Sequence, residues 1–387
     1  MSDLRYGPLD DWIASAAARR PDHPALMAGG RTLTYAELDR EVGDRAQGLS
    51  GPTVLPGPSA EFVIALHACL RAGVTAVALD PRWPAPCAEL LGGAATVLFT
   101  SGTTAEPRPV ALSAAHHEAG ARALGERLGL GPGDRWLCAL PTWHVGGMAI
   151  VVRAAVFAAT VVIHERFEPQ RVRDELAAGD ITHVSLVSTM LGRLGPLQAP
   201  ALKALLLGGG PIPAQQLEGD LPVVPTYGMT ETASAVATGA PGEPLPGVEL
   251  GIAADGEILV RGPMVAGEGW LHTGDRGSID QRGRLTVEGR LVDTIITGGE
   301  NVAPARVEAA LETHPAVAEA GVVGVPDPEW GEAVTAFVVV REALTHERLI
   351  AHARRRLAPH EVPKSLHFVE LLPRNDQGKV VRRLLGA

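Results

Sequence analysis

Cysteine is scarce in this sequence, and its few thiols do not form the pairs that a disulfide framework or a zinc site needs. Cys69, Cys87 and Cys138 stand far apart from one another. An odd number of isolated cysteines is typical of a protein from a reducing compartment, so the sequence predicts a cytoplasmic location. The histidines also lack the spacing of a metal site.

Long apolar segments are missing as well. The most apolar stretch, residues 148–163, is interrupted by Arg153 and is too short to cross a bilayer. It is typical of a buried helix followed by a strand. The first residues include several aspartates and no apolar core segment, so we expect no signal peptide. Membrane insertion is therefore not expected.

Positive charge is in the minority. The net charge is -10, and the basic run Arg354 to Arg356 is short and falls within a helix-like pattern. Nucleic-acid binding is therefore not expected. With 46% hydrophobic and 20% charged residues, the 387-residue chain has enough apolar material for a large core and two domains. The sequence leaves the oligomeric state open, and a homodimer is one alternative.

Helical patterns and short apolar strands alternate through the first part of the chain. The helical patterns cover residues 9–18, 35–49, 61–72, 114–128 and a segment that begins at Pro169. The apolar strands cover residues 31–35, 74–79, 97–99, 160–163, 182–187 and 205–207. This alternation predicts an α/β fold with a large, layered N-terminal domain whose sheets are mostly buried.

The pattern changes near Gly247. Short strands separated by Gly and Asp turns, at residues 248–252, 257–260 and 284–287, predict a small β-rich subregion. A distinct terminal part follows Arg290. A helix from Pro304, strands at 321–325 and 334–340, a helix around Leu349 and a strand at 366–369 predict a small α+β domain there. We therefore expect two domains, at residues 1–290 and 291–387.

The segment from Val97 to Val110 has the composition of a phosphate-binding loop. An apolar strand is followed by hydroxyl groups around one glycine, at Thr100, Ser101, Gly102, Thr103 and Thr104. Arg108 adds a cation between Pro107 and Pro109, which we expect to stop regular structure. These groups suit a polyphosphate, although a plain polar surface loop is an equal alternative. The segment lacks the Gly-Lys-Ser/Thr of a Walker A motif.

Further polar, glycine-rich segments follow at the ends of expected strands, where an α/β sheet usually binds its ligands. None is specific by itself, because a glycine run or a Tyr-Gly-Met-Thr-Glu segment is usually a turn or a loop. The segments cover residues 141–147, 207–211, 226–232, 269–275, 289–301 and 372–380.

In this order, and together with the loop at 100–108, these segments resemble the adenylate-forming superfamily of acyl-CoA synthetases, peptide-synthetase adenylation domains and luciferases. The resemblance extends from about Leu33 to Arg382. It implies a ligase that uses ATP, Mg²⁺ and a small carboxylic acid to form an acyl-adenylate, with CoA as the co-substrate that then receives the acyl group. Residues 1–290 would bind ATP and the acid, and residues 291–387 would form a mobile domain.

The resemblance also implies a role for each motif residue. Nucleotide binding is assigned to Thr100, Ser101, Gly102, Thr103, Thr104, Arg108, Gly208, Gly209, Gly210, Tyr227, Gly228, Met229, Asp275 and Arg290. Tyr227 would stack on the adenine, and Asp275 would accept hydrogen bonds from the ribose. Thr230 would contact the α-phosphate, and Glu231 would hold Mg²⁺. Lys379 would stabilise the charge that develops during adenylation.

For the second step, the resemblance implies that the C-terminal domain rotates and presents Gly298, Gly299 and Glu300 on the CoA side. The pivot would be Val292, at a position where many relatives carry a charged residue, and Asp293 is adjacent.

The sequence departs from the family pattern in its phosphate loop. Ala105, Arg108 and Pro109 stand where glycine, lysine and glycine are common. Arginine keeps the charge, but it is bulkier and fork-shaped. The chain is also short for the family, and it passes from Asp80 and Pro81 to the phosphate loop with a segment missing.

One branch of the superfamily is especially similar, the 2-succinylbenzoate–CoA ligases of menaquinone biosynthesis. The similarity rests on residues 143–147 with Arg153, on residues 181–189 and on the compact length. That substrate carries two carboxylates, one of which is not activated, and a cation or donor should meet it. The candidates are His144, which we also place among the catalytic residues, Arg153 and Ser188. The alternatives are a structural ion pair for Arg153 and a satisfied interior histidine for His144.

Three other functions remain open. The first is a CoA ligase for another aryl or short-chain acid. The second is a stand-alone adenylation enzyme that loads a carrier protein, which would be a separate chain because no carrier segment follows Arg382. The third is a relative that binds nucleotide without catalysis, which the intact set of motif residues disfavours.

Overall fold

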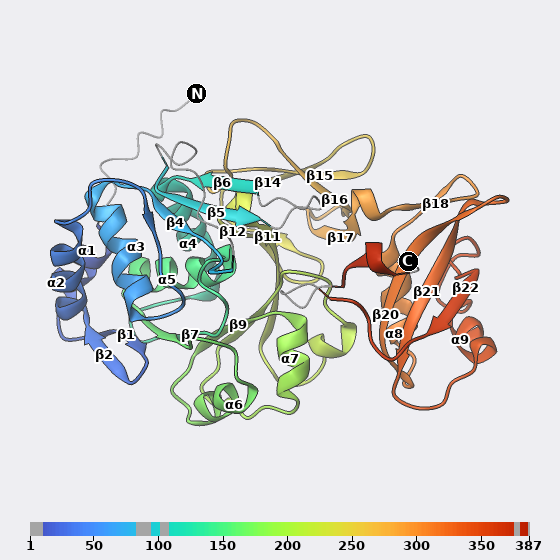
Figure 1. Ribbon diagram of the computed structural model, residues 1–387, viewed down its shortest axis with the longest axis horizontal. Helices are drawn as coiled ribbons and strands as arrows, with labels where there is room; N and C mark the ends of the chain where they lie inside the picture. Colours follow the sequence, from blue (N-terminus) through green and yellow to red (C-terminus); the bar gives the residue numbers. More distant parts are fainter. Residues whose placement is uncertain (1–10, 83–93, 101–107, 375–379, 386–387) are drawn as a thin grey trace. The chain divides into compact units, whose positions relative to one another are not determined.

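The chain forms two compact units that alternate along the sequence. The computed structural model describes residues 11–82, 94–100, 108–374 and 380–385, and Figure 1 shows its elements. The large unit comprises Met1–Gly209, Asp220–Glu249 and Val260–Leu271, and the small unit comprises Gly210–Gly219, Leu250–Leu259 and His272–Ala387. The predicted domain division at residue 290 stays a prediction.

A nine-stranded sheet forms the centre of the large unit, in the order β13-β12-β11-β10-β9-β7-β8-β1-β2. Neighbouring strands from β1 to β11 are parallel, and β2, β12 and β13 add antiparallel strands at the two ends. The strands are β1 (Pro24–Ala28), β2 (Arg31–Thr34), β7 (Arg135–Cys138), β8 (Thr160–Ile163), β9 (His183–Leu186), β10 (Ala204–Leu207), β11 (Val223–Met229), β12 (Ser234–Thr238) and β13 (Glu243–Pro244). Strands β8, β9 and β10 are buried at every position, as expected when both faces of a sheet are covered.

A four-stranded sheet in the order β3-β4-β5-β6 corrects one prediction. Its strands are β3 (Thr53–Val54), β4 (Ala76–Ala78), β5 (Thr96–Thr100) and β6 (Arg108–Leu112). We predicted that Pro109 would stop regular structure, yet it pairs with Phe99 inside the antiparallel β5–β6 ladder. Strand β6 is at the edge of the sheet, where a residue without an N–H group is tolerated. Pro107 lies outside the described residues.

Helices α1 to α4 of the large unit begin where the sequence offers side-chain caps. Thr34 and Glu37 form a capping box at the start of α2, and Ser59 caps α3, which ends at Gly73 in the left-handed conformation. Helix α5, by contrast, is apolar on all sides and is buried from Gly147 to Val156. Helices α1, α2 and α3 pack together (Figure 1). The helices are α1 (Trp12–Arg19), α2 (Tyr35–Ala46), α3 (Ala60–Ala72), α4 (Ala114–Leu128), α5 (Val145–Phe157), α6 (Pro169–Ala177) and α7 (Ser188–Leu194).

Two further sheets follow along the chain. The first has the order β14-β15-β16-β17, with β14 (Glu249–Ile252), β15 (Glu257–Arg261), β16 (Leu271–Ile279) and β17 (Leu285–Arg290). We placed residues 269–275 at the end of a strand, but they lead into the nine-residue strand β16. Its buried positions alternate from Thr273 to Gly277 although its sequence is largely polar, and this weak apolar pattern explains why the strand was missed.

The second of these sheets and its two helices form the α+β part of the small unit. Its order is β19-β18-β21-β20, and β22 pairs with β21 in parallel. The elements are β18 (Ile295–Thr297), β19 (Glu300–Val302), α8 (Pro304–Glu312), β20 (Val317–Asp327), β21 (Gly331–Val340), α9 (His346–Ala353) and β22 (Ser365–Phe368). An apolar core that includes Val307, Val322 and Leu349 joins both helices to the sheet. Arg354 to Arg356, which we expected within a helical pattern, follow the end of α9 as a turn.

The described residues carry neither a transmembrane helix nor a preformed metal cluster. None of their helices is long and apolar enough to span a bilayer. Among them, no group of three or more His, Cys, Asp and Glu side chains could hold a metal ion. Cys69 and Cys138 are buried free thiols, and Cys87 lies outside the described residues.

Glu312, the last residue of α8, should make the stability of the small unit depend on pH. Burial raises the pKa of Glu312 from 4.5 to about 7, and nearby Glu308 and Glu319 act in the same direction. The pKa of Glu312 is higher in the folded state than in the unfolded state. The stability that protonated Glu312 contributes is therefore fully present below pH 4.5 and is lost as the pH rises through about 7.

The variant Glu312→Gln should remove this pH dependence. Glutamine can still accept the hydrogen bond that the Ala320 N–H donates at 3.1 Å, but it does not ionise. Above neutral pH, we expect the variant to melt at a higher temperature than the parent, by about 2–4 °C for each kcal/mol of stability that the ionised Glu312 costs the parent. In mild acid, the two melting temperatures should differ little. Thermal melts of both proteins across this range provide the measurement. Parallel pH profiles would contradict the assignment.

Candidate active site

The predicted phosphate loop connects the two strands of a hairpin. Thr100 ends β5 and Arg108 begins β6, and the two residues are paired in the antiparallel ladder. The Thr100 hydroxyl donates to the Arg108 carbonyl at 3.5 Å, and Arg108 is exposed. Ser101, Gly102, Thr103, Thr104 and Ala105 lie outside the described residues. The structure therefore describes the two ends of this predicted loop.

The glycine run after β10 begins where β11 approaches too closely for a side chain at Gly208. A Cβ atom at Gly208 would lie 2.3 Å from the Thr226 hydroxyl oxygen on β11, and Gly209 has a φ of +79°. A Cβ at Gly210 would meet no atom within 4 Å, so the space beside Gly210 is open. Backbone is therefore accessible next to a strand end, which is the arrangement that the adenine prediction requires.

The turn from β11 to β12 carries Thr230 and Glu231. All seven residues of β11 are half-buried, in contrast to the buried strands beside it. The turn itself is a 3-10 helix, Thr230–Thr232, whose Thr232 hydroxyl accepts from the Met229 N–H and donates to the Ser234 carbonyl. Ala233 and Ser234 then have positive φ angles of 51° and 132°. Non-glycine residues rarely adopt such angles, and they are concentrated at functional sites.

Gly228 should not tolerate a side chain. A Cβ atom there would lie 1.9 Å from the Ser234 carbonyl oxygen and 2.7 Å from the Ala235 Cα, both of which are backbone atoms. We expect Gly228→Ala to lower the melting temperature and to reduce adenylation at least tenfold, because the clash displaces the turn that carries Thr230 and Glu231. Gly133→Ala, at a position where a Cβ atom would meet nothing within 4 Å, is the matched control. Equal activity and stability in both variants would contradict this prediction.

Arg153 is buried, and no negatively charged group among the described residues pairs with it. It is 2% exposed on α5, and its Nη2 atom donates to the Ser234 hydroxyl at 3.0 Å. Its Cζ atom lies 4.9 Å from the ring centroid of Trp136, a cation–π distance. Within the part of the chain that the structure describes, the buried Nε atom has no hydrogen-bond partner. Burial lowers the pKa of Arg153 from 12.5 to about 9, and no carboxylate among the described residues opposes that shift.

The other two acid-binding candidates lie in separate settings. His144 is half-buried and precedes α5, where its ring centroid is 6.0 Å from that of Trp143. The pKa of Asp80 is lowered mainly by Arg82 and partly by His144, so His144 lies near this carboxylate. Ser188 is half-buried and begins α7. The hydrogen bond that the structure gives for the Arg153 side chain is with Ser234.

Asp275 and Arg290, two predicted nucleotide ligands, are paired in the structure. They are opposite each other on β16 and β17, and the Arg290 Nε atom lies 3.0 Å from an Asp275 carboxylate oxygen. Asp275 is 8% exposed, whereas Arg290 is exposed. Arg290 also donates to the Thr273 carbonyl at 3.2 Å. This pairing fixes the two side chains relative to each other.

The predicted CoA-side residues form the turn of the β18–β19 hairpin. Gly298 and Gly299 have φ angles of +59° and +83°. The Gly298 N–H donates to the Trp330 carbonyl at 2.8 Å, and a Cβ at Gly298 would lie 3.0 Å from the Trp330 ring. Trp330 is 38% exposed, and the Lys364 Nζ atom lies 4.4 Å from its ring centroid. An exposed aromatic ring and a cation therefore flank this turn.

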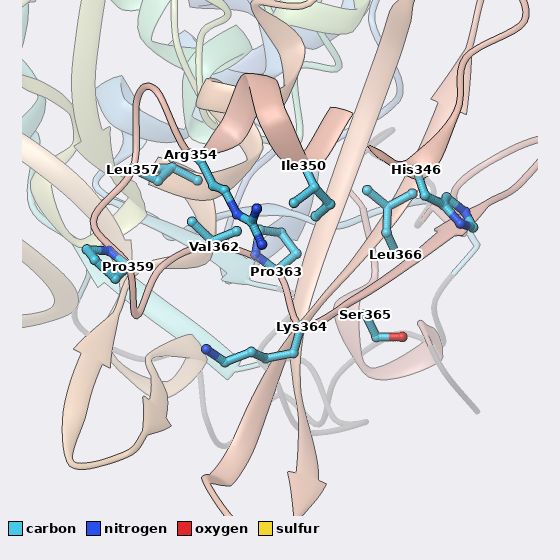
Figure 2. Close-up of a pocket in the computed structure, with 10 residues that line it drawn as sticks. All are labelled: His346, Ile350, Arg354, Leu357, Pro359, Val362, Pro363, Lys364, Ser365 and Leu366. Atoms are coloured by element: carbon cyan, nitrogen blue, oxygen red, sulfur yellow. The ribbon is translucent and has the colours of Figure 1, made fainter. Parts of the chain in front are cut away.

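A cavity of about 890 Å³ lies between α9 and the start of β22 (Figure 2). Its lining includes three basic side chains, those of His346, Arg354 and Lys364, and no acidic one (Figure 2). The lining residues are His346, Ile350, Arg354, Leu357, Pro359, Val362, Pro363, Lys364, Ser365 and Leu366. Lys364, which lines the cavity, also contacts Trp330 beside the glycine turn of the β18–β19 hairpin.

Lys379 lies outside the described residues, but the chain on both sides of it is anchored. Arg374 and Val380 form an antiparallel bridge, and the Val381 N–H donates to the Pro373 carbonyl at 2.8 Å. The side chain of Arg382 contacts Asp293 at 2.9 Å and also pairs with Glu308. Asp293 follows Val292, the predicted pivot, which is 75% exposed. Arg382 therefore links the region of the predicted pivot to the segment that carries the predicted catalytic lysine.

Sequence reasoning missed Trp136, Ser234 and Trp330. Trp136 lies in an apolar strand and has the composition of an ordinary core residue, and Trp330 has no neighbouring motif. Ser234 follows the Thr230–Glu231 motif by three residues, and this proximity is the one signal that could have identified it. Only tertiary packing brings these residues to Arg153 and Gly298.

Comparison with known proteins identifies the family. Residues 13–90 and 92–270 match the AMP-binding enzyme family, and residues 306–379 match the AMP-binding enzyme C-terminal domain. A 2-succinylbenzoate–CoA ligase of Bacillus licheniformis is 35% identical over 472 residues, covering 97% of this chain and 99% of that enzyme. That alignment is 85 positions longer than the 387-residue chain, so the chain is short for its family, as predicted. The position of the missing segment stays a prediction.

Solved structures agree with this assignment. The o-succinylbenzoate CoA synthetase of Bacillus subtilis, in complex with its acyl-adenylate intermediate, has a TM-score of 0.86 and 31% identity over 98% of each chain. The same enzyme with ATP and magnesium ion gives a TM-score of 0.86 and 31% identity over 97% of this chain and 99% of that one. The predicted fold class, a large α/β part with a small α+β part, is confirmed. The chain belongs to the adenylate-forming, AMP-binding enzyme family and is an ATP-dependent, AMP-forming acid–CoA ligase.

Proposed function

We propose that this enzyme converts 2-succinylbenzoate to 2-succinylbenzoyl-CoA, and thereby acts in menaquinone biosynthesis. A carboxylate oxygen of the acid attacks the α-phosphorus of ATP and pyrophosphate leaves. The CoA sulfur then attacks the acyl carbon and AMP leaves. Relatives at 31–35% identity carry the corresponding names. The observation in this chain that carries the substrate assignment is Arg153, a buried guanidinium without a carboxylate partner among the described residues.

A buried cation normally requires a counter-charge. Among the described residues, the Arg153 guanidinium contacts the Ser234 hydroxyl and the face of Trp136, both of which are neutral. The pKa of about 9 keeps the guanidinium protonated at neutral pH. A substrate carboxylate would supply the missing negative charge and accept charge-assisted hydrogen bonds. 2-Succinylbenzoate has a second carboxylate for this purpose, whereas a simple benzoate does not.

The large unit offers suitable groups for ATP and Mg²⁺. Glu231 places a half-buried carboxylate beside the Thr230 hydroxyl, and both are the oxygen donors that Mg²⁺ prefers. A single protein carboxylate is enough, because Mg²⁺ usually completes its coordination with waters and substrate phosphates. When bound, the metal ion neutralises phosphate charge. We assign to Thr230 the α-phosphate, and to Tyr227 and the Gly208–Gly210 turn the adenine.

We assign the ribose and the second step to the small unit. Asp275 would accept from the ribose hydroxyls while Arg290 neutralises and orients it. The Gly298–Glu300 turn would face CoA, with Trp330 and Lys364 beside it. CoA carries several phosphate charges, and the basic cavity in Figure 2 provides groups of the opposite sign.

A panel of related acids tests the substrate assignment. The purified enzyme, with ATP, Mg²⁺ and CoA, would be assayed for pyrophosphate release and thioester formation on 2-succinylbenzoate and benzoate. Two monoacids complete the panel: 2-butanoylbenzoate and 4-oxo-4-phenylbutanoate, each of which lacks one of the two carboxylates. We expect kcat/KM for the diacid to exceed that of every monoacid by about 100-fold, because a site built for a charged group rejects analogues that lack it.

The same panel separates the alternatives. If benzoate or either monoacid equals the diacid, the substrate assignment is wrong and the enzyme is a ligase for another acid. Adenylation without thioester formation on free CoA would instead indicate loading of a carrier protein.

A further inference from the structure

We infer that Glu257 is a positioning residue, which holds the peptide unit before Asp275 and thereby orients the Asp275 carboxylate toward the ribose of ATP. This inference rests on the proposed function, because the ribose contact of Asp275 is assigned there. It adds a residue that lies outside the polar, glycine-rich segments of the sequence. All the contacts that support it lie within the small unit.

Both oxygens of the Glu257 carboxylate contact the segment that leads to Asp275. The Gly274 N–H donates to Oε1 at 2.8 Å, and the Nδ1 atom of His272 lies 2.6 Å from Oε2. Glu257 is 8% exposed and lies on β15, which is the neighbour of β16 in the sheet. A buried carboxylate needs such hydrogen bonds to offset its loss of water. Glu257 and the first residues of β16 therefore hold each other in place.

The peptide unit between Thr273 and Gly274 is held at both of its polar groups. Its N–H donates to Glu257, and its carbonyl oxygen accepts from Arg290 Nη1 at 3.2 Å. Because a peptide unit is planar, these two hydrogen bonds together fix its orientation. Gly274 has a φ of +68°, and glycine rotates more freely than other residues when such contacts are lost.

Arg290 connects this peptide unit to Asp275. While Nη1 of Arg290 donates to the Thr273 carbonyl, Nε of the same guanidinium lies 3.0 Å from an Asp275 carboxylate oxygen. A guanidinium is planar and rigid, so a change at one of these contacts alters the other. Glu257 therefore acts on Asp275 through the peptide unit and Arg290.

The Thr273 hydroxyl holds the two strands together independently of Glu257. It donates to the Ile258 carbonyl at 2.7 Å and accepts from the Asp275 N–H at 3.1 Å. The backbone of Asp275 thus keeps its own anchor on β15. We therefore expect loss of the Glu257 carboxylate to change the orientation of the Asp275 side chain while the sheet stays folded.

Nucleotides with and without ribose hydroxyls report the ribose contact directly. Parent and variants would be assayed for pyrophosphate release with ATP and with 2′,3′-dideoxy-ATP. The ratio of the two kcat/KM values measures the ribose contact, and it does not depend on the fraction of enzyme that is folded. We expect the parent to prefer ATP about 100-fold, because the hydroxyls donate to a charged group. In Glu257→Ala this preference should fall at least tenfold.

Two further variants separate the hydrogen bond from the buried charge. Glu257→Asp keeps the carboxylate but withdraws it by one methylene group from the Gly274 N–H, so its preference for ATP should fall as in Glu257→Ala. Glu257→Gln can still accept that N–H and should keep most of the preference. Glu249→Ala, on the exposed side of an ion pair with Arg261, is the control and should behave like the parent.

Asp275→Ala distinguishes failure of the inference from failure of the ribose assignment. If Asp275→Ala still prefers ATP as the parent does, Asp275 does not bind the ribose, and the inference fails with that assignment. If Asp275→Ala loses the preference while Glu257→Ala and Glu257→Asp keep it, the inference alone is wrong. Equal losses of activity with both nucleotides in these two Glu257 variants would show a purely structural role and would also overturn the inference.

Discussion

Replacement of Arg153 by methionine should lower kcat/KM for 2-succinylbenzoate by about 100-fold or more, while the fold remains at least as stable as that of the parent. Methionine has a similar length and fills the same buried space, but it carries no charge and no N–H donors. The spare carboxylate would then lose its charge-assisted hydrogen bonds. Steady-state kinetics on the diacid and on the monoacids provide the measurement.

The stability part of this prediction follows because no described residue supplies a counter-charge to Arg153. Arg153 is almost completely buried, and burial lowers the pKa of its guanidinium to about 9. Replacing a buried charge by an apolar side chain of similar volume is often neutral or stabilising. Arg71→Met is the matched control, because Arg71 contacts Asp11 at 2.5 Å and also pairs with Asp39. That variant should melt at a lower temperature than the parent.

Thermal melts of the two arginine variants therefore distinguish binding from structure. If Arg153→Met melts several degrees below the parent, as Arg71→Met should, the guanidinium has a structural role. If it melts like the parent but keeps its preference for the diacid, another group binds the spare carboxylate. His144 and Ser188 would then be the next candidates.

Replacement of Lys379 by alanine should reduce adenylation by orders of magnitude with little effect on ATP binding. The family assignment implies that this lysine contacts oxygens whose negative charge grows in the transition state, and such contacts change kcat more than ground-state binding. The residues beside its segment are anchored by the Arg374–Val380 bridge and by the contacts of Arg382. Removal of the side chain should therefore leave the small unit folded.

The two steps can be measured separately for this variant. Pyrophosphate release reports adenylation, and the reaction of preformed acyl-adenylate with CoA reports thioester formation. We expect the first to collapse and the second to change little, because Lys379 is assigned to the first step. Lys203→Ala is the control, since Lys203 pairs with Asp134 at 2.8 Å in the large unit. Normal pyrophosphate release in Lys379→Ala would show that another cation performs this role.

The predictability of the fold depended on the strength of each local pattern. Helix α4 is found at the predicted residues 114–128, because its sequence has helical periodicity, the Ser113 cap and the terminal Gly129. Strands β8 and β10 agree closely with the apolar runs that predicted them. Strands β11 and β16 were less visible, because they are half-exposed or polar and carry several glycines. Strand β6 was missed because Pro109 is tolerated only at a sheet edge.

The candidate site also combines features that the sequence indicated with features that only the structure shows. Resemblance to a family located Thr230, Glu231, Asp275 and Arg290 from the order of short motifs, and their roles stay predictions. The structure added that Asp275 and Arg290 are ion-paired, and that Gly228 and Gly208 are required by close backbone approaches. Such contacts depend on which strands pair, and the spacing of motifs in one sequence does not report strand pairing.

By itself, the sequence indicated the family and the acid–CoA ligase chemistry, because these depend on residue types in a fixed order along the chain, while the roles of the motif residues stay predictions. Tertiary structure decided the environment of Arg153. Residues 136, 153 and 234 are far apart in sequence, and they meet because α5 packs against the sheet that contains β7 and β12. Burial removes water from the guanidinium, and this is why we propose that it binds an anion. That no described residue supplies a counter-charge became visible only when the fold placed neutral groups around Arg153.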